Sequence, residues 1–342
     1  MNKLSKNNFN GTMQKSRSRI PGILLTAVIA VPAWLIGEKF PIIGSPVLGI
    51  LFGMILAFFK RPKALETGIT YTSKKLLQYS IILLGFNMNL YSVLKVGSQT
   101  IILMLFTLTA TFLGAFFLGK ALKVEKNTNI LIGVGTAICG GSAIAATAPV
   151  IQADDEDVAR SISTIFLFNV IAAFLFPFLG HLLQMTDYHF GLWAGTAVND
   201  TSSVVAAGYS FSNAAGNLAV IVKLTRTLMI IPVTLVLALF VSGKKAQDNK
   251  LNYKLSKIFP WFILGFVTAS IISTFLPMTD FTKELLVKAG KYIIVMAMAA
   301  IGLNTNLVKL VKNGLRPILL GLSCWIILSL TSLLVQFTIL SL

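Results

Sequence analysis

Two basic residues inside an apolar segment, Lys223 and Arg226, are the strongest chemical signal in this sequence. Residues three positions apart share one face of a helix, so both side chains are expected to point the same way. A charge inside a membrane segment is costly and marks a functional position by default. Arg holds an oxyanion through two parallel hydrogen bonds, and Lys acts as a point charge. The pair predicts attraction of an anionic substrate; the alternative is that both side chains snorkel to the membrane interface.

Two stretches rich in Gly, Ser, Thr and Ala, residues 133–147 and 193–208, contain the other candidate binding groups. Adjacent Gly140 and Gly141 each weaken a helix by about 1 kcal/mol relative to Ala, which favours an unwound turn. Unwound backbone at membrane depth lies in protein or beside a water-filled cavity, and it exposes helix N-termini that attract anions. The alternative is that small residues only let helices pack closely. The predicted substrate-binding residues are Gly140, Gly141, Ser142, Asn199, Thr201, Ser202, Lys223 and Arg226.

Asp200 is the only acidic residue in the interior of the predicted membrane segments. We expect it to carry a proton or to help bind Na⁺, and a static ion pair with Lys223 or Arg226 is the alternative. The acidic run 154–157 is typical of a solvated helix N-terminus, where carboxylates favour the positive end of the helix dipole. No metal site is predicted, because the two His and two Cys residues do not have the spacing of metal ligands.

The composition is that of a membrane protein. Of 342 residues, 55% are hydrophobic and 12% are charged, whereas a typical soluble domain has about 25% charged residues. The mean hydropathy of +0.81 excludes an ordinary soluble enzyme. A helix needs about 20 apolar residues to cross a bilayer. Eleven candidate segments satisfy or approach this length: 22–39, 43–59, 76–94, 99–119, 128–151, 158–183, 189–211, 217–242, 258–276, 285–304 and 317–340.

The net charge of +17 is distributed as in a membrane protein. Most of the 29 Lys and Arg residues lie in five short polar segments between apolar runs, and this pattern follows the positive-inside rule. It predicts a cytoplasmic N-terminus, with residues 1–19 as a basic tail and residues 20–342 as a single transmembrane domain. No basic segment is long or interleaved with stacking aromatic residues, which excludes nucleic-acid binding.

Two internal similarities predict a repeat. Residues 84–90 and 301–307 both read apolar-Gly-apolar-Asn-X-Asn-Leu, and residues 135–138 resemble residues 195–198. The first pair closes segments that are seven crossings apart and therefore run in opposite directions, as an inverted repeat requires. The charge pattern does not decide whether segments 128–151 and 189–211 span the membrane or re-enter it. The order of the matched segments differs between the two halves of the chain.

Together these stretches resemble the YeiH-type family of proposed sulfate exporters. The resemblance is carried by residues 135–142, 158–177, 195–208 and 221–226 and by the two Asn-X-Asn motifs, and it extends from about Ile20 to the end of the chain. It implies a distant relation to bile-acid/sodium symporters and cation:proton antiporters. It also implies a panel bundle, a core bundle, inverted repeats and crossed broken helices. The fold expected is therefore an all-α polytopic membrane protein with about 9–11 transmembrane segments, two of them broken or re-entrant.

The function expected is that of a secondary transporter that exports a small oxyanion, such as sulfate or a sulfonate, across the cytoplasmic membrane. The expected partners are this anion, H⁺ or Na⁺ as a coupling ion, the lipid bilayer and, as an open question, a second copy of the chain. No ATP-binding motif or cofactor motif is present, and no catalytic pair of carboxylates or metal-ligand cluster predicts an enzyme. The alternatives are a Na⁺-coupled organic anion symporter and, from another class, a membrane sensor or an intramembrane enzyme.

Overall fold

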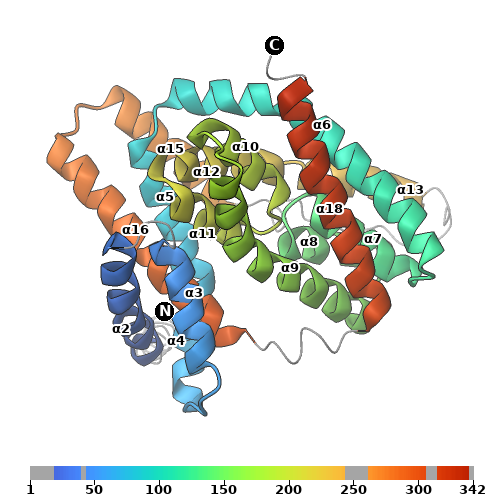
Figure 1. Cartoon of the computed structure of the whole chain (residues 1–342), viewed down its shortest axis with the longest axis horizontal. Coiled ribbons are helices and arrows are strands. Elements are labelled where there is room, and N and C mark those ends of the chain that lie inside the picture. Colours follow the sequence, from blue (N-terminus) through green and yellow to red (C-terminus); the bar gives the residue numbers. More distant parts are fainter. Residues whose placement is uncertain (1–18, 40–43, 243–260, 306–313, 339–342) are drawn as a thin grey trace, which may run out of the picture. The chain divides into compact units, whose positions relative to one another are not determined.

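The computed structural model describes residues 19–39, 44–242, 261–305 and 314–338, and within these ranges every regular element is a helix (Figure 1). The protein is a multi-pass all-α membrane protein. Residues 1–18 of the predicted basic tail and the polar connection 244–257 lie outside the described residues. The predicted transmembrane domain divides into two compact units, Met1–Asn89 with Gly265–Asn306, and Leu90–Leu264 with Leu307–Leu342.

Within the described residues the predicted apolar segments fall mostly on helices, although segments 76–94, 128–151 and 189–211 are each interrupted by non-helical residues. Among the described residues, six helical stretches are long and apolar enough to cross a membrane: α2 (Ile20–Lys39), α6 (Leu90–Ala121), α9 (Asp155–Leu182), Asn213–Leu237, α16 (Asp280–Asn304) and α18 (Leu315–Thr338). Three shorter apolar helices are α3 (Ser45–Leu56), α8 (Gly141–Ile151) and α15 (Trp261–Phe275). The span Asn213–Leu237 comprises α12 (Asn213–Thr227) and the start of α13 (Ile230–Ser242).

The first unit is organised around α16. This helix packs against α2, α3 and α5 (Leu77–Leu84), and α5 continues the short helices α4 (Glu66–Tyr71) and η2 (Thr72–Leu76). Close approach of α16 to α3 depends on glycine. A Cβ on Gly302 would collide with the carbonyl oxygen of Ile50, and a Cβ on Gly53 would collide with that of Ala299. Bare backbone at these two positions therefore lets the helices touch.

The two Asn-X-Asn motifs make equivalent contacts in the first unit. Gly302 packs on the backbone of α3, and its counterpart Gly85 packs on that of α15, where an added Cβ would lie 2.6 Å from the Phe266 carbonyl oxygen. The next motif position also matches. The Phe86 carbonyl accepts a hydrogen bond from Ser273 Oγ at 2.6 Å, and the Leu303 carbonyl accepts one from Arg61 Nη1 at 2.6 Å. These contacts support a true repeat, although residues 306–307 of the second motif lie outside the described residues.

The second unit contains two broken helices. The first is α7 (Lys126–Ala137) with α8, and the second is α10 (Asp187–Ala197) with α11 (Thr201–Phe211). Helix α9 packs against α7, α8 and α11, and α12 packs against α10 and α11. Helices α6 and α18 pack on each other and on α7 (Figure 1).

The order of the helices along the chain allows an alignment of the matched segments as two sets. The first set runs α3, α5, α6, α7/α8 and α9, and the second runs α10/α11, α12, α15, α16 and α18. If α7/α8 corresponds to α10/α11, α9 to α12 and α5 to α16, the second set is a circular permutation of the first. The second set starts with the broken helix and its following helix, with which the first set ends.

Candidate functional site

The break in the first discontinuous helix is caused by Gly140. Its backbone has φ 70° and ψ −130°, a conformation that only glycine adopts without strain. Helix α7 ends at Ala137, and α8 begins at Gly141 without a side-chain cap. The unwound turn predicted from the adjacent glycines is therefore present, and it covers residues 138–140.

The break in the second discontinuous helix has no glycine, and Asp200 starts the new helix instead. Val198 and Asp200 are extended, with φ of −86° and −94°. The Asp200 carboxylate caps α11, because Oδ2 accepts the backbone N–H of Ser202 at 3.0 Å and also the Ser202 hydroxyl. Such a cap satisfies one of the free N–H groups at a helix N-terminus.

Lys223 and Arg226 on α12 bind the carbonyl ends of both broken helices. Lys223 Nζ donates to the carbonyl oxygens of Ile138 at 3.0 Å and Val198 at 2.9 Å. Arg226 Nε donates to the Ala137 carbonyl at 2.7 Å, and Nη2 donates to the carbonyls of Thr136, at 3.2 Å, and Ala137. The last carbonyls of a helix have no partner within the helix and carry the negative end of its dipole, so two cations stabilise them.

Both cations are inside the protein. The side chains of Lys223 and Arg226 are 0% exposed, so neither snorkels to an interface. The ion pairs formed by the described residues join Arg61 to Glu66 and Arg160 to Glu125 and Glu156, so a static pair with Asp200 is not among them. The sequence correctly places both side chains on one buried face, but their hydrogen-bond partners are backbone oxygens.

The N-termini of α8 and α11 adjoin. A Cβ added to Gly140 would lie 3.6 Å from Cβ of Asp200, so the two helix starts are in near contact. The space next to Gly141 is open, since an added Cβ would meet no atom within 4 Å. Ser142 is exposed and Thr201 is partly exposed at the same helix starts. Donors on an accessible surface beside the uncapped start of α8 are suited to binding an anion, whereas the carboxylate of Asp200 already occupies the start of α11.

The remaining predicted site residues are buried beside this surface. Ser202 is 4% exposed and bonds to Asp200, as described above. Asn199 is 1% exposed, and its Oδ1 has no hydrogen-bond partner. The predicted residues thus form two groups: the helix starts near the surface, and the two cations at the helix ends in the interior.

Two residues that the sequence did not identify hold the site together. Asn169 on α9 accepts the backbone N–H of Asp200 through Oδ1 at 3.1 Å. Trp325 on α18 donates from Nε1 to the carbonyl of Ala197 at 3.1 Å, which satisfies the last residue of α10. An amide in the apolar run 165–173 was a signal for Asn169. A tryptophan in a membrane helix carries no such signal.

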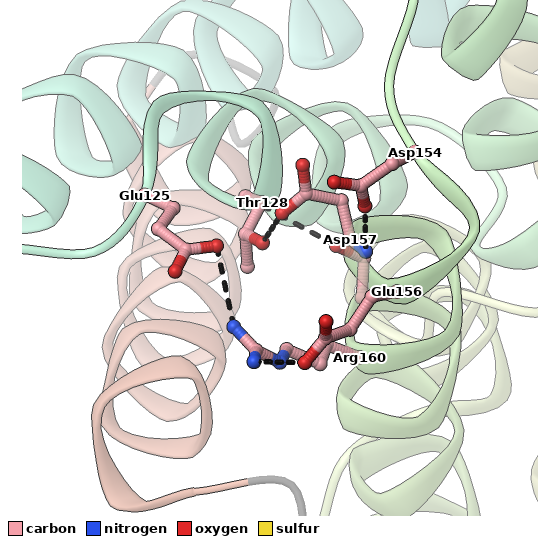
Figure 2. A network of polar contacts seen from close by, with 7 residues as sticks. Glu125, Thr128, Asp154, Glu156, Asp157 and Arg160 are labelled. Carbon is pink, nitrogen blue, oxygen red and sulfur yellow. Dashed lines mark hydrogen bonds and ion pairs between the residues drawn. The ribbon is translucent and has the colours of Figure 1, made fainter.

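The acidic run 154–157 forms the helix N-terminus that the sequence predicts, and three of its four residues are exposed; the prediction of a solvated side chain is wrong only for Asp157. Asp154 caps α9, because its Oδ1 accepts the backbone N–H of Asp157 at 2.7 Å. Asp157 itself is 6% exposed and accepts a hydrogen bond from Thr128 on α7. Arg160 pairs with Glu156 and reaches Glu125 at 3.2 Å (Figure 2). The run therefore ties the start of α9 to the start of α7.

Comparison with known proteins assigns the family. Residues 21–321 match the family model described as "Conserved hypothetical protein 698". A UPF0324 membrane protein of Streptococcus mutans is 50% identical over 329 residues, covering 92% of this chain and 96% of the relative. The chain belongs to this family. Further members include UPF0324 membrane proteins of Streptococcus pyogenes, 50% identical over 333 residues (94% of this chain, 97% of the relative), and Fusobacterium nucleatum, 45% identical over 337 residues (92% and 97%).

Family membership agrees with the resemblance that the sequence motifs indicate, because the family match and the resemblance both extend over nearly the whole chain. The family match starts at residue 21, so the whole of the predicted basic tail 1–19 lies before it. The site residues described above lie inside the matched range except Trp325 on α18, which lies beyond residue 321.

Proposed function

We propose that this UPF0324 protein is a secondary transporter that exports a small oxyanion, of the sulfate or sulfonate type, across the cytoplasmic membrane. The N-terminus is cytoplasmic in this proposal, in keeping with the basic segments between the apolar runs. The protein is not an enzyme in this proposal; it changes the location of its substrate and makes or breaks no bond in it. Transport proceeds by movement of one bundle against the other around a fixed site.

The observation that carries the proposal is the meeting of two helix N-termini at an accessible surface. The N–H groups at the start of α8 have no side-chain cap, and the space beside Gly141 is open. A sulfate or sulfonate group accepts hydrogen bonds on several oxygens, which suits backbone N–H groups and the hydroxyls of Ser142 and Thr201. We assign substrate contact to this surface.

Lys223 and Arg226 have a different part in the proposal. Their hydrogen bonds are made to carbonyl oxygens in the interior, so they attract the anion through the electrostatic potential and not through contact. Two positive charges beside the breaks offset the negative ends of α7 and α10. The start of α8 has no side-chain cap and keeps its positive end free for an anion, whereas the Asp200 carboxylate caps the start of α11. Asp200, which is partly exposed, is the group that couples substrate to H⁺ or Na⁺.

The test is anion flux through purified protein in liposomes. Vesicles are loaded with labelled sulfate, sulfite or methanesulfonate, and release is followed with and without Na⁺ and a pH gradient. We expect saturable release of at least one of these anions. Gly141→Val fills the open space beside α8, and it should reduce that release at least tenfold while the protein keeps its wild-type melting temperature.

The matched control is Gly97→Ala on α6. A Cβ at Gly97 would lie 3.4 Å from Thr225 Oγ1, an ordinary contact away from the two breaks, so flux should be unchanged. Release that is equally fast from Gly141→Val and wild type would contradict the assigned surface. Unchanged flux after combined replacement of Lys223 and Arg226 by Ala would contradict the part given to the cations.

A further inference from the structure

The Lys223 ammonium group lies between two backbone carbonyl oxygens at the C-terminal ends of two different helices. Nζ lies 3.0 Å from the Ile138 carbonyl oxygen and 2.9 Å from that of Val198, and the side chain is 0% exposed. Ile138 follows the last residue of α7, and Val198 follows the last residue of α10. The two carbonyls therefore belong to the negative ends of two helix dipoles.

Such a pair of carbonyls is a natural cation site. Carbonyl oxygens are hard donors of the kind that alkali and alkaline-earth ions select, and half-helix C-terminal ends in membrane transporters coordinate Na⁺. Arg226, one turn along α12, places a second positive charge on the neighbouring carbonyls of Thr136 and Ala137. A mobile cation that entered this region would meet two fixed cations and would be repelled.

We propose that the Lys223 ammonium group takes the place of a coupling cation between the carbonyls of Ile138 and Val198, so that the structure at the two helix breaks does not depend on Na⁺. This inference rests on the proposed function only in its consequence for transport, namely that Na⁺ does not drive anion movement. Its structural part concerns the site alone. Removal of the ammonium opens a site for a small monovalent cation between the carbonyls of Ile138 and Val198.

Two substitutions at one position separate the loss of charge from the loss of volume. Lys223→Ala removes the atoms of a propylammonium ion and leaves an opening between the carbonyls. Lys223→Met has no charge but fills most of the same space. Melting temperatures of both variants and wild type are measured in detergent at one ionic strength, in the chloride salts of choline, Na⁺, K⁺ and n-propylammonium.

The expected result is selective rescue of Lys223→Ala. Its melting temperature in choline should fall by about 10 °C, since a buried charged partner of two carbonyls is lost. Na⁺, K⁺ or n-propylammonium should restore at least a third of that loss, with saturation by concentration. Lys223→Met should be destabilised without rescue, and wild type should melt at the same temperature in all four salts.

Several results overturn the proposal. They are rescue of neither variant by any cation, equal rescue of Lys223→Met, and stabilisation of wild type by Na⁺ over choline. If Lys223→Ala folds only when purified with n-propylammonium or Na⁺, the proposal is supported, and if it folds in none of the salts, the proposal fails.

Flux supplies an independent measurement on wild type. Release of the anion should be equal in Na⁺ and choline, and a requirement for Na⁺ overturns the inference. Absence of any flux contradicts the proposed function instead, and the melting temperatures still decide the role of Lys223.

Discussion

The guanidinium group of Arg226 closes the C-terminal end of α7, because its Nε donates to the carbonyl oxygen of Ala137 at 2.7 Å. A second nitrogen of the same group, Nη2, reaches the carbonyls of Ala137 and Thr136. One side chain therefore satisfies two carbonyls that helix geometry leaves unpaired. This contact joins α12 to a broken helix, and we expect Arg226 to stabilise the break.

Replacement of Arg226 by Ala should destabilise the protein strongly. Buried carbonyls lose their charged donor and a cavity forms, so we expect a loss of about 3–5 kcal/mol in the free energy of unfolding. Arg226→Lys keeps the charge but not the forked geometry, and it should lie between Ala and wild type. Thermal unfolding in detergent measures both. Arg160→Ala is the control, because its ion pairs lie at the surface and should contribute less than about 1 kcal/mol.

Substitution by Ala should affect protein stability differently at the two adjacent glycines of the first break. Gly140 has φ 70°, so Gly140→Ala forces an L-residue into a strained conformation and should cost about 1–3 kcal/mol. An Ala side chain at Gly141 meets open space, and Gly141→Ala should leave the melting temperature within about 2 °C of wild type. Equal destabilisation of the two variants would show that the break is not held by the conformation of Gly140.

Asp200 combines a cap with a charge, and two substitutions separate these properties. Asn caps a helix as well as Asp does, so Asp200→Asn should keep the melting temperature, whereas Asp200→Ala should cost about 1 kcal/mol. If the carboxylate also couples substrate to an ion, both variants should lose the dependence of flux on the pH gradient. A pH-dependent flux that survives in Asp200→Asn would remove Asp200 from ion coupling while leaving its cap intact.

Contact between α3 and α16 should depend on Gly302. A methyl group there would collide with the Ile50 carbonyl oxygen, a backbone atom that cannot move aside alone. We expect Gly302→Ala to separate the helices and cost about 1–3 kcal/mol, as overpacking does. Unfolding of Gly302→Ala, compared with the Gly97→Ala control, gives the measurement. A neutral effect at Gly302 would mean that the two helices are not in tight contact.

Two carboxylates of the acidic run 154–157 should contribute differently to the stability of the protein. Asp157 is buried and accepts a hydrogen bond from Thr128, so Asp157→Ala leaves a buried hydroxyl unpaired and should cost about 1–3 kcal/mol. Asp155 is exposed at the same helix start, and Asp155→Ala should cost less than about 1 kcal/mol. Protease sensitivity at 120–128 should rise only in Asp157→Ala, if this bond ties α7 to α9.

The sequence predicted the helices of this protein better than their contacts. The apolar segments were recognisable because hydrophobicity acts over short windows, and the break at Gly140 because two adjacent glycines weaken a helix. The repeat motifs and the different order of the matched segments were also visible, but the helix contacts of these segments were not. Only the structure shows that α9 packs on α7, α8 and α11, and α12 on α10 and α11.

The sequence predicted part of the candidate site, because some of its residues are unusual in an apolar segment. Lys223 and Arg226 stand out because charges are rare in apolar segments, and their shared face follows from a spacing of three. Asn169 and Trp325 did not stand out, since a single amide or indole in a membrane helix has many ordinary uses. Their importance lies in what they bond to, the Asp200 N–H and the Ala197 carbonyl.

What the sequence by itself determined is the class of the protein, its apolar segments, the glycine break and the presence of two interior cations. These are properties of single residues and near neighbours. Only the tertiary structure decided that the cations bind carbonyl oxygens, because the partners of Lys223 lie 85 and 25 positions away along the chain. It also decided that the starts of α8 and α11 adjoin, since contact between distant helices depends on how the entire unit packs.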